Sequence, residues 1–175
     1  MTRAAPLRVR PEQAADLPRV FELHARAFRR PAEAELVDAL RGAGALALSL
    51  VAEAGGRPVG HVAFSPVQVG EGAAAWPALA LGPLAVDPDH QSGGVGSALV
   101  REGLARCRAE RHAVVFVLGH SDYYPRFGFE PAAARGLAYE GGARFAPAFF
   151  VAELEPGALD GRSGVVRYRP EFASL

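Results

Sequence analysis

The sequence predicts an α/β (α+β) domain built on a mixed, mostly antiparallel sheet of six to seven strands with helices on both faces. Three observations support this fold class. Two apolar runs separated by a glycine pair between residues 46 and 69 are typical of a β-hairpin. A strand, a glycine-rich loop, a helix and a second strand follow in order between residues 79 and 118, which predicts a parallel strand pair. Apolar runs at residues 149–154 and 165–168 are expected to close the sheet.

The N-terminal part of the chain predicts one strand and two helices. Residues 7–10 alternate as a short strand does, and apolar residues then recur at helical spacing from Leu17 to Phe28. The helical spacing returns over residues 32–41. Glu33 and Glu35 stand near the start of this second helix, where negative charge is favoured, and we interpret both as surface charges.

The next segment predicts the hairpin and a loop. Residues 46–53 and 58–69 are rich in Val, Leu and Phe, and the glycine pair lies in the turn 54–57 between them. Residues 70–77 are small and polar apart from Trp76. We therefore expect a loop here, with the Trp76 ring packed in it.

The middle of the chain predicts two parallel strands joined by a helix. A strand over residues 79–86 contains Gly82 and Pro83 in mid-run, which a regular central strand would not accept, so we expect a bulge or a splay there. A helix over residues 97–109 and a strand over residues 113–118 follow. Because such a crossover is right-handed, the glycine-rich loop opens at the carboxyl edge of the sheet.

Composition excludes several classes of function. The chain has 175 residues, which fits one domain over 1–175, and its 19 basic and 19 acidic residues give zero formal net charge. Nucleic acid is therefore not an expected partner. A single cysteine, Cys107, rules out an intramolecular disulfide, and we expect it to be a buried apolar group. The five histidines show no ligand spacing, so no metal site is expected.

Nothing in the sequence predicts export or a membrane. The N-terminal segment lacks the apolar core of a signal peptide, and no stretch of membrane-spanning length is free of charge and of proline. We therefore expect a cytoplasmic protein.

The glycine-rich loop predicts a site for a phosphorylated ligand. Gly93, Gly94 and Gly96 allow the backbone to approach a ligand, and the following helix directs its free N–H groups and positive dipole end at the loop. A P-loop is excluded, because no Gly-Lys-Ser/Thr follows. A dinucleotide fingerprint is disfavoured, because only its first two glycines are present.

Two motifs in the same order resemble the GNAT N-acetyltransferase superfamily. The segment Gln91-Ser92-Gly93-Gly94-Val95-Gly96 is similar to its pyrophosphate loop, Gln/Arg-x-x-Gly-x-Gly/Ala. The segment Tyr124-Pro125-Arg126-Phe127-Gly128-Phe129 is similar to its Tyr-x-x-x-Gly-Phe signature. Residues 60–66 and 81–86 are also similar to a bacterial subgroup of predicted N-acetyltransferases, so the resemblance covers most of the chain.

The resemblance implies a GNAT-like single domain with a central splayed parallel strand pair, and acetyl-CoA as the cofactor. Backbone N–H groups of the glycine-rich loop would bind the CoA pyrophosphate, and strand groups freed by the splay would bind the pantetheine arm. The implied cofactor-binding residues are Leu84, Ala85, Val86, Gln91, Ser92, Gly93, Gly94, Val95, Gly96 and Ser97. An N–H near Leu84 would polarise the thioester carbonyl. Tyr124 matches the position of the general acid that protonates the CoA thiolate.

The general base is left open by the sequence. The strand over residues 79–86 carries no glutamate, and no asparagine follows the strand over residues 113–118, where His120 stands with Ser121 and Asp122. The candidates are Glu33, Glu35, His61, Ser65 or a water molecule held by backbone groups. We interpret Tyr123 as a structural residue.

The expected function is transfer of the acetyl group of acetyl-CoA to a primary amine of a small molecule or peptide by direct attack. The alternatives are a catalytically silent acyl-CoA-binding or interaction module of the same fold, and a nucleotide-binding domain of another type. We expect the loops after the first helix, at residues 70–76 and at residues 132–147, to set the acceptor. Dimers are usual among similar proteins, so a homodimer is one option that the resemblance implies.

Overall fold

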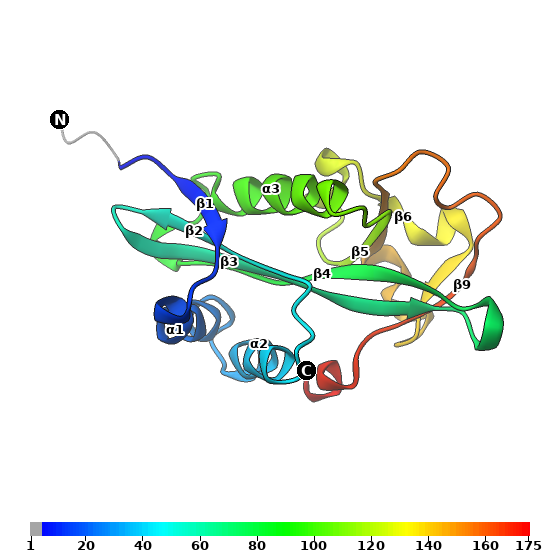
Figure 1. Cartoon of the computed structure of the whole chain (residues 1–175), viewed down its shortest axis with the longest axis horizontal. Coiled ribbons are helices and arrows are strands. Elements are labelled where there is room, and N and C mark those ends of the chain that lie inside the picture. Colours follow the sequence, from blue (N-terminus) through cyan, green and yellow to red (C-terminus); the bar gives the residue numbers. More distant parts are fainter. Residues whose placement is uncertain (1–4) are drawn as a thin grey trace.

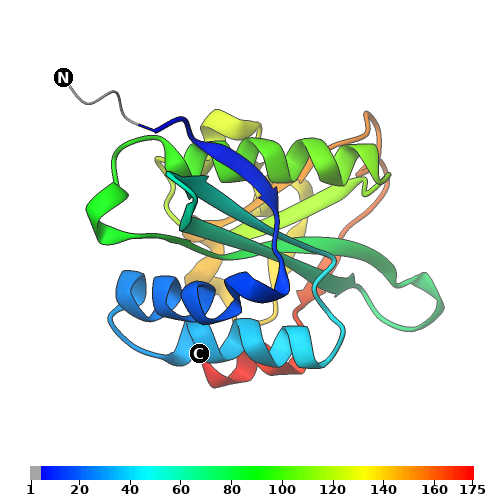
Figure 2. The ribbon, with the colours of Figure 1, turned by 60° about the vertical axis from the view of Figure 1, so that its left-hand side comes forward.

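The computed structural model describes residues 5–175 and places one mixed sheet between two helical layers (Figure 1). The elements are β1 (Arg8–Pro11), α1 (Leu17–Phe28), α2 (Ala32–Gly42), β2 (Leu48–Ala54), β3 (Arg57–Val69), β4 (Trp76–Val86), α3 (Val95–Ala109), β5 (Val114–Leu118), β6 (Glu130–Pro131), β7 (Leu137–Tyr139), β8 (Phe149–Glu153) and β9 (Gly164–Arg167). α3 covers one face of the sheet, and α1 and α2 cover the other (Figures 1 and 2). The predicted fold class is confirmed.

The first four residues of the N-terminal segment, for which the sequence predicts no signal peptide, lie outside the described residues. Among the helices of residues 5–175, none combines the length and the apolar character that crossing a membrane requires.

The sheet contains the seven predicted strands and two short additional ones. Its main order is β1-β2-β3-β4-β5-β8-β6, with β9 paired to β3 and to β7. Pairing is antiparallel except between β4 and β5 and between β7 and β9. The hairpin β2–β3 and the parallel pair β4–β5 are as predicted. The sequence did not indicate β6 and β7, because two or three residues are too few to show a periodicity.

Trp76 belongs to a strand and not to a loop, so the predicted loop over residues 70–77 is too long. β4 begins at Trp76, which pairs with Val69 of β3. The indole is 7% exposed, and its ring centroid lies 6.5 Å from that of Phe116 on β5. Burial of this large ring extends the strand into a segment whose composition indicates a loop.

The middle of β4 departs from regular pairing, as its Gly-Pro step predicted. Opposite β3, Val62 pairs with Leu84 and Phe64 pairs with Leu81, so Gly82 and Pro83 form a bulge. Gly82 has φ +138°, a backbone conformation that favours glycine. On the other side, the pairing of β4 with β5 ends at Leu81 opposite Val117. Beyond Leu81, the edge of β4 that faces β5 has no strand partner within residues 5–175.

A buried carboxylate joins α1 to the turn that follows β4. Asp87 is 2% exposed and accepts hydrogen bonds from the Arg19 guanidinium, from Arg26 Nη1 at 2.8 Å and from the Asp89 backbone N–H at 3.0 Å. Burial acts to raise the pKa of Asp87, but the Asp89 N–H and the two guanidinium groups hold this pKa below its usual value. Asp87 is therefore ionised and fixes α1 against the sheet.

A second link joins α1 to β3 through two buried histidines. His24 Nε2 lies 2.8 Å from His61 Nδ1, and His61 Nε2 lies 2.8 Å from Ser49 Oγ. Burial lowers the pKa of His24 to about 4 and that of His61 well below its usual value. Both rings are therefore neutral at pH 7.

Replacing Asp87 tests the first link. We expect Asp87→Asn to lower the free energy of unfolding by about 2 kcal/mol, because it removes a buried charge that compensates Arg19 and Arg26. Asp89→Asn is the matched control, because its side chain is 78% exposed. Urea unfolding at pH 7.5 measures both variants. Equal losses of unfolding free energy in the two variants would contradict the role of Asp87 as the buried link between α1 and the sheet.

Acid tests the second link. Because the folded state disfavours protonated His24, stability is fully present above pH 6.5 and falls as the pH drops towards 4. We expect a loss of about 2 kcal/mol between pH 7.5 and pH 5 from His24, with His61 acting in the same direction. Asp87 and Asp16, whose carboxylate accepts a hydrogen bond from Arg10 at 2.7 Å, have lowered pKa values, so their contributions to stability fade only below about pH 4.

Urea unfolding at pH 7.5, 6 and 5 measures this dependence. The double variant His24→Leu/His61→Leu is expected to flatten it, whereas His112→Gln, at a partly exposed position, should leave it unchanged. Equal stability of the unmodified protein at pH 7.5 and pH 5 would overturn the interpretation.

Candidate functional site

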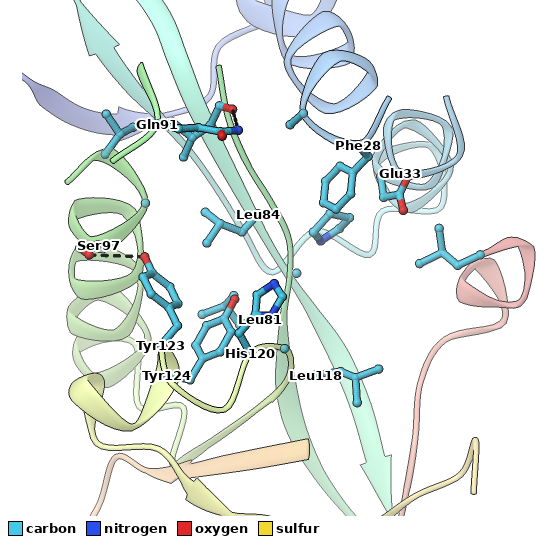
Figure 3. A pocket seen from close by; sticks show the side chains of 18 of the residues that line it. Phe28, Glu33, Leu81, Leu84, Gln91, Ser97, Leu118, His120, Tyr123 and Tyr124 are labelled. Carbon is cyan, nitrogen blue, oxygen red and sulfur yellow. Dashed lines mark hydrogen bonds between the residues drawn. The ribbon is translucent and has the colours of Figure 1, made fainter. Parts of the chain in front are cut away.

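A cavity of about 1130 Å³ opens where β4 and β5 stop pairing. One wall comes from the end of β4, the glycine-rich loop and the start of α3. The opposite wall comes from α1, the start of α2 and the C-terminal segment, and the residues that follow β5 line the space between them (Figure 3). The cavity therefore reaches residues from both faces of the sheet.

The glycine-rich loop forms one end of this cavity. Gln91, Ser92, Gly94, Val95, Gly96 and Ser97 line it, and Gly93 does not. Gly94 precedes α3 with φ +83°, which turns the chain so that the first N–H groups of the helix, free of helical partners, face the cavity. The Gln91 side chain donates to the Val86 carbonyl oxygen at 3.2 Å and holds the loop against β4. This arrangement can bind an anionic group.

The end of β4 presents alternate residues to the cavity. Leu84 and Val86 line it, whereas Ala85 is 1% exposed, pairs with His61 and has its side chain on the other face. Since β5 has already separated from β4, the backbone groups on this edge of β4, apart from the Val86 carbonyl oxygen that Gln91 holds, are available to an extended ligand.

Tyr124 lines the cavity, and its ring is held by packing. Its side chain is 7% exposed, and the ring contacts Gly119 so closely that a Cβ on this glycine would lie 2.3 Å from Tyr124 Cε2. The ring also meets Phe129 edge to face at 5.6 Å between centroids. Burial raises the pKa of the Tyr124 phenol above its usual value of 10, so the group keeps its proton at neutral pH.

Tyr123 also lines the cavity, a position that the sequence analysis did not foresee. Its hydroxyl oxygen lies 3.4 Å from Ser97 Oγ at the start of α3 (Figure 3). The Arg126 guanidinium carbon lies 4.9 Å from the centroid of its ring. In the sequence, the only sign of this role is that Tyr123 stands next to Tyr124. Two adjacent tyrosines do not indicate which of the two hydroxyl groups faces the cavity.

Of the four side chains considered as bases, Glu33 alone lines the cavity. Its interpretation as a surface charge is wrong: Glu33 is 4% exposed, because the first turn of α2 faces the cavity. The carboxylate is paired with Arg30, whose Nε lies 3.0 Å from both oxygens. Glu35 is exposed, and His61 and Ser65 are fully buried outside the cavity.

Several lining residues lie in places that the sequence analysis did not identify. His120 follows β5 and lies beside Tyr124 (Figure 3). Tyr168, Phe172 and Leu175 bring the C-terminal segment to the cavity. The loop near residues 70–76, expected to set the acceptor, contributes no lining residue, whereas Tyr139 and Phe145 from the predicted 132–147 region do.

Cys107 does not take part in this site. It lies in the last turn of α3 and is fully buried, and burial raises the pKa of its thiol to about 12, so it is not a thiolate nucleophile. Within residues 5–175, no group of three His, Cys, Asp or Glu side chains is placed to hold a metal ion.

Comparison with known proteins places these features in a family. A model described as an acetyltransferase (GNAT) domain matches residues 8–132. The chain is 40% identical over 165 residues to the uncharacterized N-acetyltransferase YhbS of Escherichia coli K12, covering 94% of this chain and 97% of that protein. It is 43% identical over 117 residues to the uncharacterized N-acetyltransferase YjhQ of the same organism, covering 65% of this chain and 64% of that protein.

Two solved structures share the whole fold. The crystal structure of YhbS from Escherichia coli in complex with CoA superposes with a TM-score of 0.90 at 38% identity, covering 99% of this chain and 95% of that one. A GNAT family acetyltransferase from Brucella melitensis, in complex with acetyl-CoA, superposes with a TM-score of 0.78 at 36% identity, covering 96% and 99%.

Proposed function

Since the chain belongs to the GNAT family of acetyl-CoA-dependent N-acetyltransferases, we propose that it transfers the acetyl group to a primary amine of a small molecule or peptide by direct attack. The observation that carries this proposal is the cavity through the sheet. It joins an anion-binding helix start, a free edge of β4 and a buried, protonated Tyr124. These three features fit a ligand that is anionic at one end, amide-bearing in the middle and reactive at the other.

The residues of the site take distinct parts in binding. N–H groups from Gln91 to Ser97 would hold the pyrophosphate, with Gly93 contributing through its backbone. The free edge of β4 at Leu84, Ala85 and Val86 would hydrogen-bond the pantetheine arm as an added strand does. A backbone N–H near Leu84 would polarise the thioester carbonyl.

The chemistry requires two proton transfers at the chain's own side chains. Bound acetyl-CoA supplies the acetyl group and a thiolate leaving group. As the amine nitrogen bonds to the carbonyl carbon and the carbon–sulfur bond breaks, Tyr124 donates its hydroxyl proton to the departing sulfur. The proton lost by the amine passes to Glu33, directly or through water, since Glu33 and Tyr124 lie on opposite walls (Figure 3). The products are an N-acetyl amine and CoA.

Ligand titration and variant kinetics test this function. We expect the protein to bind CoA in preference to NAD and ATP, and to release free thiol from acetyl-CoA in the presence of amines from a broad panel. Tyr124→Phe is expected to lower kcat by about 100-fold and to leave the dissociation constant for CoA unchanged, because only the proton donor is lost.

Tyr123→Phe is the matched control, because it removes a neighbouring hydroxyl that contacts Ser97. A much larger loss of kcat in Tyr123→Phe than in Tyr124→Phe would transfer the acid role to Tyr123. Binding of CoA without thiol release across the whole panel would instead identify a silent binding module.

Replacing Glu33 tests the assignment of the base. Glu33→Gln is expected to lower kcat by about 100-fold with unchanged CoA affinity, because the amide cannot accept the proton. Glu35→Gln is the control, since Glu35 is exposed on the same helix. Rates are measured from pH 6 to pH 9 by thiol release. A loss in His120→Gln larger than that in Glu33→Gln would assign the base to His120.

A further inference from the structure

The cavity continues past Tyr124 into an end lined by aromatic rings. Phe28 comes from α1, Tyr139 from β7, Phe145 from the segment 143–148, Tyr168 from the residues after β9 and Phe172 from the turn Pro170–Ser174. We call these five residues the aromatic wall. Phe28 and Glu33 lie across the cavity from Tyr123 and Tyr124, which follow β5 (Figure 3).

Four members of the aromatic wall hold one another in place. Tyr139 meets Phe145 edge to face at 5.3 Å between ring centroids and Tyr168 at 5.2 Å. Tyr168 meets Phe172 at 5.0 Å. Such edge-to-face contacts fix ring positions without a ligand. The wall is therefore already assembled around the space that it lines.

Apolar side chains gather at this end although they remain accessible. Of the six large apolar side chains that are exposed within residues 5–175, three line the cavity: Phe28, Leu118 and Leu175. Phe28 is 39% exposed, although its ring stacks on the buried His24. Apolar surface concentrated in a cavity, and not scattered over the molecule, is typical of a site for an apolar group.

The charges of this end favour an acceptor with one amine. Among the side chains of the described residues that line the cavity, that of Glu33 is the single carboxylate, and Arg30 already offsets its charge. A polyamine would bring further ammonium groups into an aromatic wall that offers them no carboxylate. Among the described residues, the Tyr168 hydroxyl has no hydrogen-bond partner and its oxygen is closed to solvent, so this tyrosine contributes apolar ring surface and no polar contact to the wall.

We propose that the acceptor is an aralkylamine, a primary amine joined by a short chain to an aromatic ring. This inference rests on the proposed function, since the cavity end is the acceptor site only if acetyl transfer occurs at Tyr124. The ring packs against Phe28, Phe172 and Tyr168, and the amine points past Glu33 towards Tyr124. The aromatic wall selects the body of the acceptor, and Glu33 accepts the proton of its nitrogen.

Direct binding tests the proposal independently of turnover. The protein saturated with CoA is titrated by calorimetry with 2-phenylethylamine, ethylamine and putrescine. We expect 2-phenylethylamine to bind at least about tenfold more tightly than either, because the phenyl ring removes apolar surface from water and the second ammonium of putrescine has no partner. Tighter binding of ethylamine or putrescine would overturn the proposal.

Two variants of the aromatic wall and one matched control locate the binding. Phe172→Ala and Phe28→Ala are each expected to weaken binding of 2-phenylethylamine about tenfold, with the dissociation constant for CoA unchanged. Phe21→Ala is the control, because Phe21 is 36% exposed on α1 and does not line this cavity. Unchanged binding in both wall variants would overturn the proposal.

Thiol release with the same amines distinguishes failure of the proposed acetyl transfer from failure of the proposed aralkylamine acceptor. Tight binding of 2-phenylethylamine without thiol release would contradict the proposed function, and the aromatic wall would then be a binding site for the amine and not an acceptor site. Thiol release with putrescine or a lysine peptide, but not with 2-phenylethylamine, would support acetyl transfer and contradict the aralkylamine.

Discussion

The structure depends on one interruption of backbone pairing, the point after Leu81 where β4 leaves β5. In a continuous sheet, the carbonyl and N–H groups of both strands would satisfy each other, and no cavity could pass between the faces. The bulge at Gly82 and Pro83 removes that pairing from one edge of β4 while β3 still holds the other. A free strand edge, normally a liability, becomes the lining of a site.

α3 and α1 flank the place where β4 and β5 separate, and their contacts fix the residues that line the cavity there. α3 starts at Gly94 and directs its free N–H groups at one end of the cavity. Asp87 and the pair His24–His61 fix α1 to the sheet from the other side. The Asp87 carboxylate is buried, so its ion pairs are screened less by salt than surface ion pairs are. Together with the neutral histidine pair, these contacts hold Phe28 and Glu33 opposite the tyrosines.

Burial has opposite outcomes for two ionisable groups, of which one stays charged and the other stays neutral. Asp87 stays ionised because hydrogen bonds and guanidinium groups outweigh the cost of burial. Tyr124 has no such partner among the described residues, so burial, together with the neighbouring Tyr123, raises its pKa and keeps the phenol protonated. The cost of removing a charge from water is offset at Asp87, which therefore holds α1, and is not offset at Tyr124, which therefore keeps a proton to donate.

The sequence by itself determined the local features: the hairpin, the parallel pair, the bulge at Gly82 and the glycine-rich loop before a helix, whose start it placed at residue 97, two residues after the Val95 at which α3 begins. Each depends on neighbours within a few residues, through side-chain periodicity, the missing N–H of proline or the freedom of glycine. Only the tertiary structure decided that Glu33 turns inward, that Tyr123 meets Ser97 and that Phe172 joins Phe28 in one wall. These contacts join segments far apart in the chain, and the packing of whole elements, which no local pattern encodes, brings them together.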